Sequence, residues 1–148
     1  MAYIIADNII SPLGETSEEN YLSVKAGRSG IRAYEPGTCN IPEGFYASLL
    51  FEDFETLALR SAQKAIANAQ KDIGNKQKAI GNGRLELKGK RTAFILSSTK
   101  GNIEENISLA DSAQRIASQL GIDAKPIVVC NACISGLSAL ILGNRLID

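Results

Sequence analysis

The sequence contains no histidine among its 148 residues. Histidine is the commonest general base and metal ligand in proteins, because its side chain titrates near neutral pH. Any nucleophile in this chain must therefore be activated by another group. The lack of histidine also excludes a tetrahedral structural zinc site within one chain, since three cysteines cannot fill four positions.

The sequence also has only three cysteines and a formal net charge of zero. Cys39, Cys130 and Cys133 are an odd number, which does not suit a disulfide framework. Sixteen basic and sixteen acidic residues cancel and are scattered, which leaves no footprint for nucleic acid. The first residues have no basic segment and carry Asp7 inside their apolar run, so they predict neither a signal peptide nor a membrane span. We therefore expect a cytoplasmic protein with no nucleic-acid or membrane partner.

The apolar residues that are present fall into alternating strand-like and helix-like segments. A domain of this length can bury a sizeable core, and the order predicts an α/β fold with a mostly parallel or mixed sheet covered by helices. Capping boxes mark two helix starts, Thr16 with Glu19 and Asn102 with Glu105. The expected strands are Tyr3 to Ile10, a short one at Phe45 to Leu50, Thr92 to Ser97 and Ile127 to Cys130, and the expected helices are Thr16 to Ala26, Phe54 to Ala69, Asn102 to Leu120 and Ile134 to Ile147.

The last of these helices is apolar almost all the way round. Its large apolar residues are Ile134, Leu137, Leu140, Ile141, Leu142, Leu146 and Ile147. Such a helix is typically buried on every side. A single sheet cannot surround a helix, so we expect another subunit, or sequence outside this chain, to cover its far face.

Cys133 stands at the turn from the last strand into this helix. The free N–H groups of a helix start favour the thiolate and can hold a developing oxyanion, which would activate the thiol without histidine. A sharp turn from strand to helix is also the geometry that exposes the serine of a nucleophile elbow. The alternative is that Cys133 is only a small buried apolar residue, as most free cysteines are.

Cys130 and Cys133 also have the spacing of a redox dithiol. Cys130 is expected within the strand, and the intervening Asn131 and Ala132 include neither the proline nor the glycine usual in such loops. The dithiol interpretation is therefore the weaker one.

Four blocks of the sequence, in order, resemble the β-ketoacyl-ACP synthases, the condensing enzymes of the thiolase-like superfamily. They are NIISPLGETSEENYLSVKAGRSGIR at 8–32, LALRSAQKAIANA at 57–69, FILSSTKGNIEE at 94–105 and VVCNACISGLSALILGNRLI at 128–147. They resemble the opening strand, turn and helix of the family, its alanine-rich helix, its next strand and helix, and its active-site cysteine with the central helix. Together they cover nearly the whole chain.

The resemblance implies a thiolase-like fold, α/β/α/β/α in full-length members, of which residues 1–148 would be the N-terminal part, truncated before the C-terminal half. It implies that Cys133 accepts an acyl group from acyl carrier protein, and that a malonyl thioester is then decarboxylated and condensed with it, in fatty acid or polyketide synthesis. It implies no metal or redox cofactor. It also implies a homodimer with the strand Ile127 to Cys130 at the interface.

The sequence departs from the family pattern in two places. The family's later histidines have no counterpart here, so the fragment alone is expected to be inactive in condensation. The segment Phe51 to Glu55 (FEDFE) is acidic where many members are basic, which leaves Arg60, Lys64 and Lys71 as the candidate contacts for the carrier protein. The alternative function is a non-catalytic module that dimerises through its uncovered helix or sheet edge.

Overall fold

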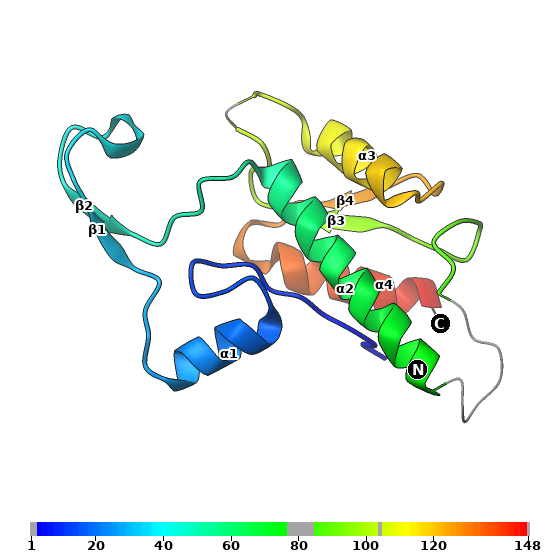
Figure 1. Cartoon of the computed structure of the whole chain (residues 1–148). Coiled ribbons are helices and arrows are strands. Elements are labelled where there is room, and N and C mark those ends of the chain that lie inside the picture. The colour runs from blue at the N-terminus through cyan, green and yellow to red at the C-terminus, as the bar shows by residue number, and fades with distance from the viewer. Residues whose placement is uncertain (1–2, 77–84, 104, 148) are drawn as a thin grey trace. The chain divides into compact units, whose positions relative to one another are not determined.

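The structure, a computed structural model, describes residues 3–76, 85–103 and 105–147. The chain divides into two compact units, one formed by residues 1–6 and 53–148 and the other by residues 7–52. The elements in chain order are α1 Ser17–Lys25, β1 Arg32–Tyr34, the 3-10 helix η1 Thr38–Asn40, β2 Phe45–Ala47, α2 Phe54–Lys76, β3 Ile95–Ser97, α3 Leu109–Leu120, β4 Ile127–Val129, the 3-10 helix η2 Ala132–Ile134 and α4 Ser135–Ile147 (Figure 1).

A parallel pair of strands, β3 and β4, forms the centre of the larger unit. Leu96 lies opposite Val128, and both side chains pack into the core with residues of α2 and α3. Successive side chains of a strand point to opposite faces, and Ile95 lines a cavity beside α4. Helices therefore cover both faces of this sheet, as the alternating pattern of the sequence predicts.

The core of this unit is small. Leu96, Ala113 and Ile116 are its buried centre, and Ile116 is only 1% exposed. Beside it the hydroxyl of the buried Ser112 on α3 donates to Glu55 Oε1 on α2 at 2.8 Å, and Arg115 Nη1 lies 3.6 Å from Glu55 Oε2. This polar contact joins α2 to α3 at the edge of the core.

Helix α3 begins later than the sequence predicts. Its N-cap is Ser108, whose Oγ accepts a hydrogen bond from the N–H of Asp111 at 3.1 Å. Asn102 and Glu105 do contact each other at 3.5 Å, but they lie in a turn, closed by a bond from Ile107 N–H to Asn102 O. The left-handed φ of Asn106, 52°, interrupts any helix there. The prediction of a helix from Asn102 is therefore wrong at its start, whereas its end at Gly121, with φ 70°, is confirmed.

The predicted first strand, Tyr3 to Ile10, is not a strand in the structure. A strand needs a neighbour to accept its backbone hydrogen bonds, and no strand of the described ranges pairs with this segment. The predicted strands Thr92 to Ser97 and Ile127 to Cys130 are present but shorter, and Cys130 follows β4 by one residue.

The smaller unit, residues 7–52, contains α1 and an antiparallel hairpin of β1 and β2. The predicted capping box is confirmed, with Glu19 N–H bonded to Thr16 Oγ1 and Thr16 N–H to Glu19 Oε2, each at 3.1 Å. Strand β1 lies in a stretch where the sequence predicts neither a strand nor a helix. Its Tyr34 ring stacks on Phe45 of β2 at 5.4 Å, and such a cross-strand pair depends on a partner distant in sequence. The parallel and antiparallel strands thus form two separate sheets rather than one mixed sheet.

In the described part of the chain, no helix combines the length and the apolar character that crossing a bilayer requires.

Candidate functional site

Cys133 lies in η2, the short 3-10 turn that joins the end of β4 to the first residue of α4. Its side chain is free and exposed. The sequence-based expectation placed this thiol at the start of the last helix, and the structure places it two residues before α4 begins. The thiol is thus neither buried in mid-helix nor part of a disulfide.

The turn around Cys133 is held by the side chain of Ser135. Ser135 is 5% exposed. Its Oγ accepts a hydrogen bond from the N–H of Asn131 at 2.8 Å and donates one to the carbonyl of Ala132 at 2.7 Å. Thr99, in the loop that follows β3, donates its Oγ1 proton to the same carbonyl at 3.3 Å. The residue before Cys133 is therefore bonded from the helix and from a distant loop.

Ala132 has a φ of 44°, in the left-handed region. A residue with a Cβ atom is disfavoured there, because Cβ approaches the following carbonyl oxygen. Strained backbone of this kind persists only where surrounding contacts hold it, and it is enriched at functional sites. The bonds of Ser135 and Thr99 supply such contacts at Ala132.

One backbone hydrogen-bond donor at this turn is available, the N–H group of Cys133. The N–H of Ile134 bonds to Asn131 O at 3.1 Å, and the N–H of Ser135 bonds to Ala132 O. Within the described ranges, no backbone or side-chain acceptor receives the N–H of Cys133. This N–H is therefore open to a ligand atom beside the thiol.

The other two cysteines are also free and exposed. Cys130 donates its thiol proton to Thr99 O at 3.5 Å, a contact that directs it to the loop after β3. Cys39 lies in η1 of the smaller unit and itself has a left-handed φ of 53°. The structure thus keeps Cys130 and Cys133 as two separate thiols.

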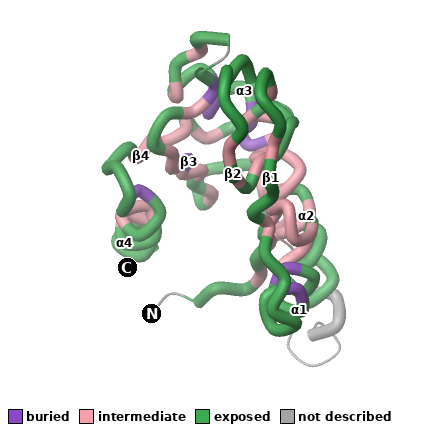
Figure 2. Tube along the Cα trace, turned by 90° about the vertical axis from the view of Figure 1, so that its left-hand side faces the viewer, coloured by how far each residue is buried: buried purple, intermediate pink, exposed green. Residues whose placement is uncertain are grey.

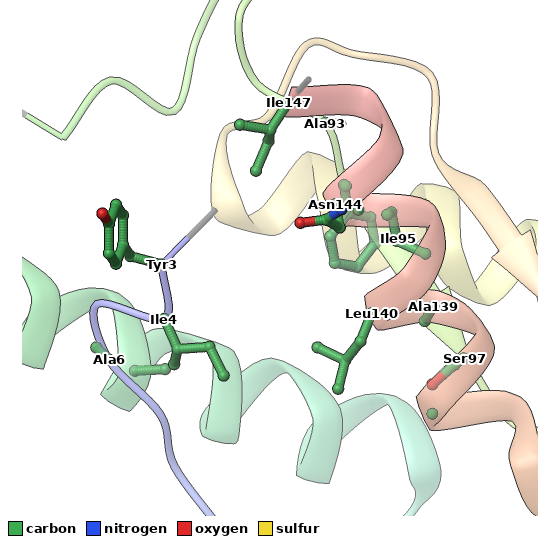
Figure 3. Close-up of a pocket in the computed structure, with 14 residues that line it drawn as sticks. Tyr3, Ile4, Ala6, Ala93, Ile95, Ser97, Ala139, Leu140, Asn144 and Ile147 are labelled. Carbon is green, nitrogen blue, oxygen red and sulfur yellow. The ribbon is translucent and has the colours of Figure 1, made fainter. Parts of the chain in front are cut away.

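A cavity of about 850 Å³ lies beside α4. Figure 3 shows Leu140, Asn144 and Ile147 of α4 on one side and Tyr3 and Ile4 of the N-terminal segment on the other. Ile95 of β3 and Ala65 of α2 also contribute to the lining. The lining includes Gly136, three residues along the chain from Cys133, whereas Cys133 itself does not line the cavity.

Helix α4 is not enclosed in this structure. Of its described residues only Ser135 is buried, and Figure 2 shows the tube of the helix mostly in the colour of exposed residues. The exposed large apolar residues at its start and along it are Ile134, Leu137, Leu140, Ile141, Leu146 and Ile147. Within this chain β3 and β4 cover only one side of the helix. The expectation that another subunit, or sequence outside this chain, covers its far face stays a prediction.

The residues proposed from the sequence as carrier contacts lie along α2. Lys71 is exposed, whereas Arg60 and Lys64 are half-buried. Glu55 of the acidic segment is engaged with Ser112 and Arg115. In the described ranges, no three carboxylate or thiol side chains gather as a metal site would require.

Sequence reasoning missed Ser135 and Thr99. Ser135 is the first residue of α4, and its hydroxyl bonds backward to Asn131 and Ala132. A capping serine instead bonds forward into the helix, so capping preference gives no local signal for Ser135. Nothing in the sequence indicates that Thr99 meets Ala132, since the two residues are 33 positions apart.

Comparison with known proteins identifies no relative. No family model matches the chain, and it matches no curated protein and no solved structure.

Proposed function

We propose that this chain is the acyl-accepting part of a β-ketoacyl-ACP synthase, with Cys133 as the acceptor. The observation that carries the proposal is the turn itself: an exposed, free thiol stands between a parallel strand and a helix, beside its own unbonded N–H. The four sequence blocks that resemble the condensing enzymes agree with this placement.

The proposed step is a thioester exchange. The sulfur of Cys133 attacks the carbonyl carbon of an acyl thioester on a carrier protein, and the carbonyl oxygen becomes an oxyanion beside the N–H of Cys133. The bond from that carbon to the carrier's sulfur then breaks, and the carrier leaves as a thiol with the proton that Cys133 lost. The acyl group remains on Cys133 as a new thioester.

In the complete reaction of the family, a malonyl thioester loses carbon dioxide, and its carbanion attacks the acyl group on the cysteine. Many members use two histidines for this second half. Since the sequence contains no histidine, we assign to it the first half only. No metal or redox cofactor enters either half.

The cavity beside α4 supports an apolar acyl substrate. Its volume of about 850 Å³ falls within the roughly 300–1,000 Å³ typical of small-molecule sites. Leu140, Ile95 and Ile147 give it an apolar wall, and its lining includes Gly136, three residues after Cys133. An acyl chain could lie there while its carbonyl group meets the thiol.

The test is labelling with a thiol-reactive fatty-acyl analogue, followed by peptide mapping of all three cysteines. We expect the label on Cys133 and none on the variant Cys133→Ser. The matched control is Cys130→Ser, which removes a neighbouring exposed thiol and should leave labelling of Cys133 unchanged. Labelling of Cys39 or Cys130 in preference to Cys133 would contradict the proposal.

The exposed face of α4 favours a second candidate, a module that associates with a further copy of this chain. Six large apolar side chains of η2 and α4 are exposed, and exposed apolar patches of this kind typically mark interaction sites. Strand β4 is paired on one edge only, with β3, in the described structure, so its other edge could continue the sheet into a second copy. This homodimer is compatible with acyl transfer and also possible without it.

A further inference from the structure

We propose that Ser135 is a positioning residue for Cys133: its hydroxyl holds Ala132 in the left-handed conformation and so sets the direction of the thiol and N–H that follow. This inference rests on the proposed function of Cys133. It adds a residue and a mechanism that the resemblance to the condensing enzymes did not supply.

The hydroxyl of Ser135 bonds to backbone atoms on both sides of Ala132. It accepts from the N–H of Asn131 at 2.8 Å and donates to the carbonyl of Ala132 at 2.7 Å. These two bonds close the chain into a loop around the one residue whose φ, 44°, is unfavourable for alanine. If the hydroxyl were removed, the loop would lose both bonds, and Ala132 would be free to relax to a negative φ.

Because Ser135 is buried, loss of its two hydrogen bonds should destabilise the turn. Ser135 is 5% exposed, so water cannot easily replace its hydroxyl at the N–H of Asn131. Thr99 gives weaker support, since its bond to the carbonyl of Ala132 is 3.3 Å long and comes from an exposed residue. We therefore expect Ser135 to contribute most and Thr99 less.

The reason that this matters for Cys133 is geometric. The peptide group between Ala132 and Cys133 carries the N–H that the proposed oxyanion would use. A change in the backbone angles of Ala132 rotates that group and turns both the N–H and the thiol away from the directions that they have in this turn. Loss of the hydroxyl should therefore slow the attack of the thiol on an acyl carbonyl group.

The test measures the rate at which a short-chain acyl thioester acylates each of the three cysteines, by peptide mapping. Ser135→Ala should lower the rate at Cys133 by roughly three- to tenfold, the effect of losing about one buried hydrogen bond. The rates at Cys39 should not change. The matched control is Ser138→Ala: the Ser138 hydroxyl accepts a bond from the side chain of Asn131 at 3.2 Å and, among the described residues, makes no bond to the backbone of Ala132.

A second substitution separates positioning from general damage to the fold. Glycine adopts a left-handed φ without steric cost, so Ala132→Gly combined with Ser135→Ala should restore the rate at Cys133 to within about twofold of the original. Thr99→Val should show a smaller loss than Ser135→Ala. Circular dichroism should show the same helix content for each variant as for the original protein, so that a change in rate is not caused by unfolding.

The outcomes distinguish this inference from the proposed function. If Cys133 in the original protein reacts no faster than Cys39 in the same sample, the proposed function fails. If Cys133 is fast but Ser135→Ala leaves its rate unchanged, or if Ala132→Gly does not restore the rate, the positioning role of Ser135 is overturned while the proposed function stands.

Discussion

Asp53 shows how a single side chain determines where α2 begins. Its Oδ1 accepts a hydrogen bond from the N–H of Thr56 at 2.9 Å, and its carbonyl accepts one from the N–H of Leu57 at 3.1 Å. These are the bonds of an N-cap residue. The hydrogen bonds from the Thr56 side chain and then from the Thr56 backbone lower the pKa of Asp53 below its ordinary value of 3.8.

A lowered pKa has a defined consequence for stability. The charged carboxylate is favoured by the folded state, so its contribution is present at pH values above about 3.8 and is lost as the pH falls through the lower folded value. Asn is as good an N-cap as Asp but has no charge, so Asp53→Asn isolates the effect of the charge.

We expect Asp53→Asn to lower the free energy of unfolding of the larger unit in urea at pH 7 by roughly 0.3 kcal/mol, a small effect because the charge is exposed at a helix start. The difference should shrink as the pH is lowered from 4 toward 2, within the window set by the ordinary pKa of 3.8 and the lower folded value. The exposed Asp123→Asn is the control. A difference that grows toward low pH would contradict this account.

Helix α3 illustrates how the start of an element depends on its surroundings. Both Asn102 and Ser108 are residues that cap helices, and the sequence offers each a suitable acidic partner three positions later, Glu105 and Asp111. In the structure Ser108 is the N-cap, because the left-handed φ angles of Gly101 and Asn106 are incompatible with a helix that begins at Asn102.

The substitution Ser108→Ala tests where α3 begins, because the two possible starts predict changes in stability of opposite sign. If Ser108 is the N-cap, Ser108→Ala should destabilise the larger unit by about 1 kcal/mol in urea unfolding. If the helix began at Asn102, position 108 would be helix interior, and alanine would stabilise it by up to about 0.5 kcal/mol.

The exposed Ser118, in the same helix, provides the control: Ser118→Ala should be neutral or slightly stabilising by either account. Rescue by Ser108→Thr, which retains a capping hydroxyl, would confirm that the hydroxyl is responsible. Equal effects of Ser108→Ala and Ser118→Ala would argue that Ser108 does not cap α3.

Large apolar side chains are exposed in both units of the described structure. In the smaller unit, residues 7–52, all of which the structure describes, no apolar side chain is buried; the buried residues are Asn20 and Ser23. In the larger unit, α4 presents exposed leucines and isoleucines along its length. Association with another protein surface would remove these side chains from water.

We expect the protein to self-associate through α4. Leu137 is 59% exposed and does not line the cavity, so Leu137→Lys should interrupt an α4 interface without changing the candidate site. Light scattering over a concentration series should show a dimer for the original chain and a monomer for Leu137→Lys.

The matched control is Leu22→Lys, which changes an exposed leucine of α1, 49% exposed, in the other unit. It should leave the oligomeric state as it is. A monomer at every concentration for the original chain, or equal effects of the two substitutions, would contradict association through α4.

The elements that the sequence predicts well are those specified by neighbouring residues. The Thr16–Glu19 capping box, the glycine at 121 that ends α3 and the apolar period of α2 all act within one or two helical turns, so they are readable in the sequence. The β-strand, turn and helix around Cys133 are readable for the same reason.

Contacts between distant parts of the chain decided the rest. Strand β1 pairs with β2, no strand of the described ranges pairs with residues 3–10, and Thr99 bonds to Ala132. Local sequence pattern indicates none of these three results. The exposure of α4 also depends on tertiary contacts. The apolar composition of this helix predicts burial, and only the positions of β3 and β4 show which of its sides is covered. Short-range hydrogen bonds and helical periodicity depend on residues close together in the sequence, so the sequence alone determines them. Burial and backbone strain depend on which distant segments pack together in the folded chain, so only the tertiary structure decides them.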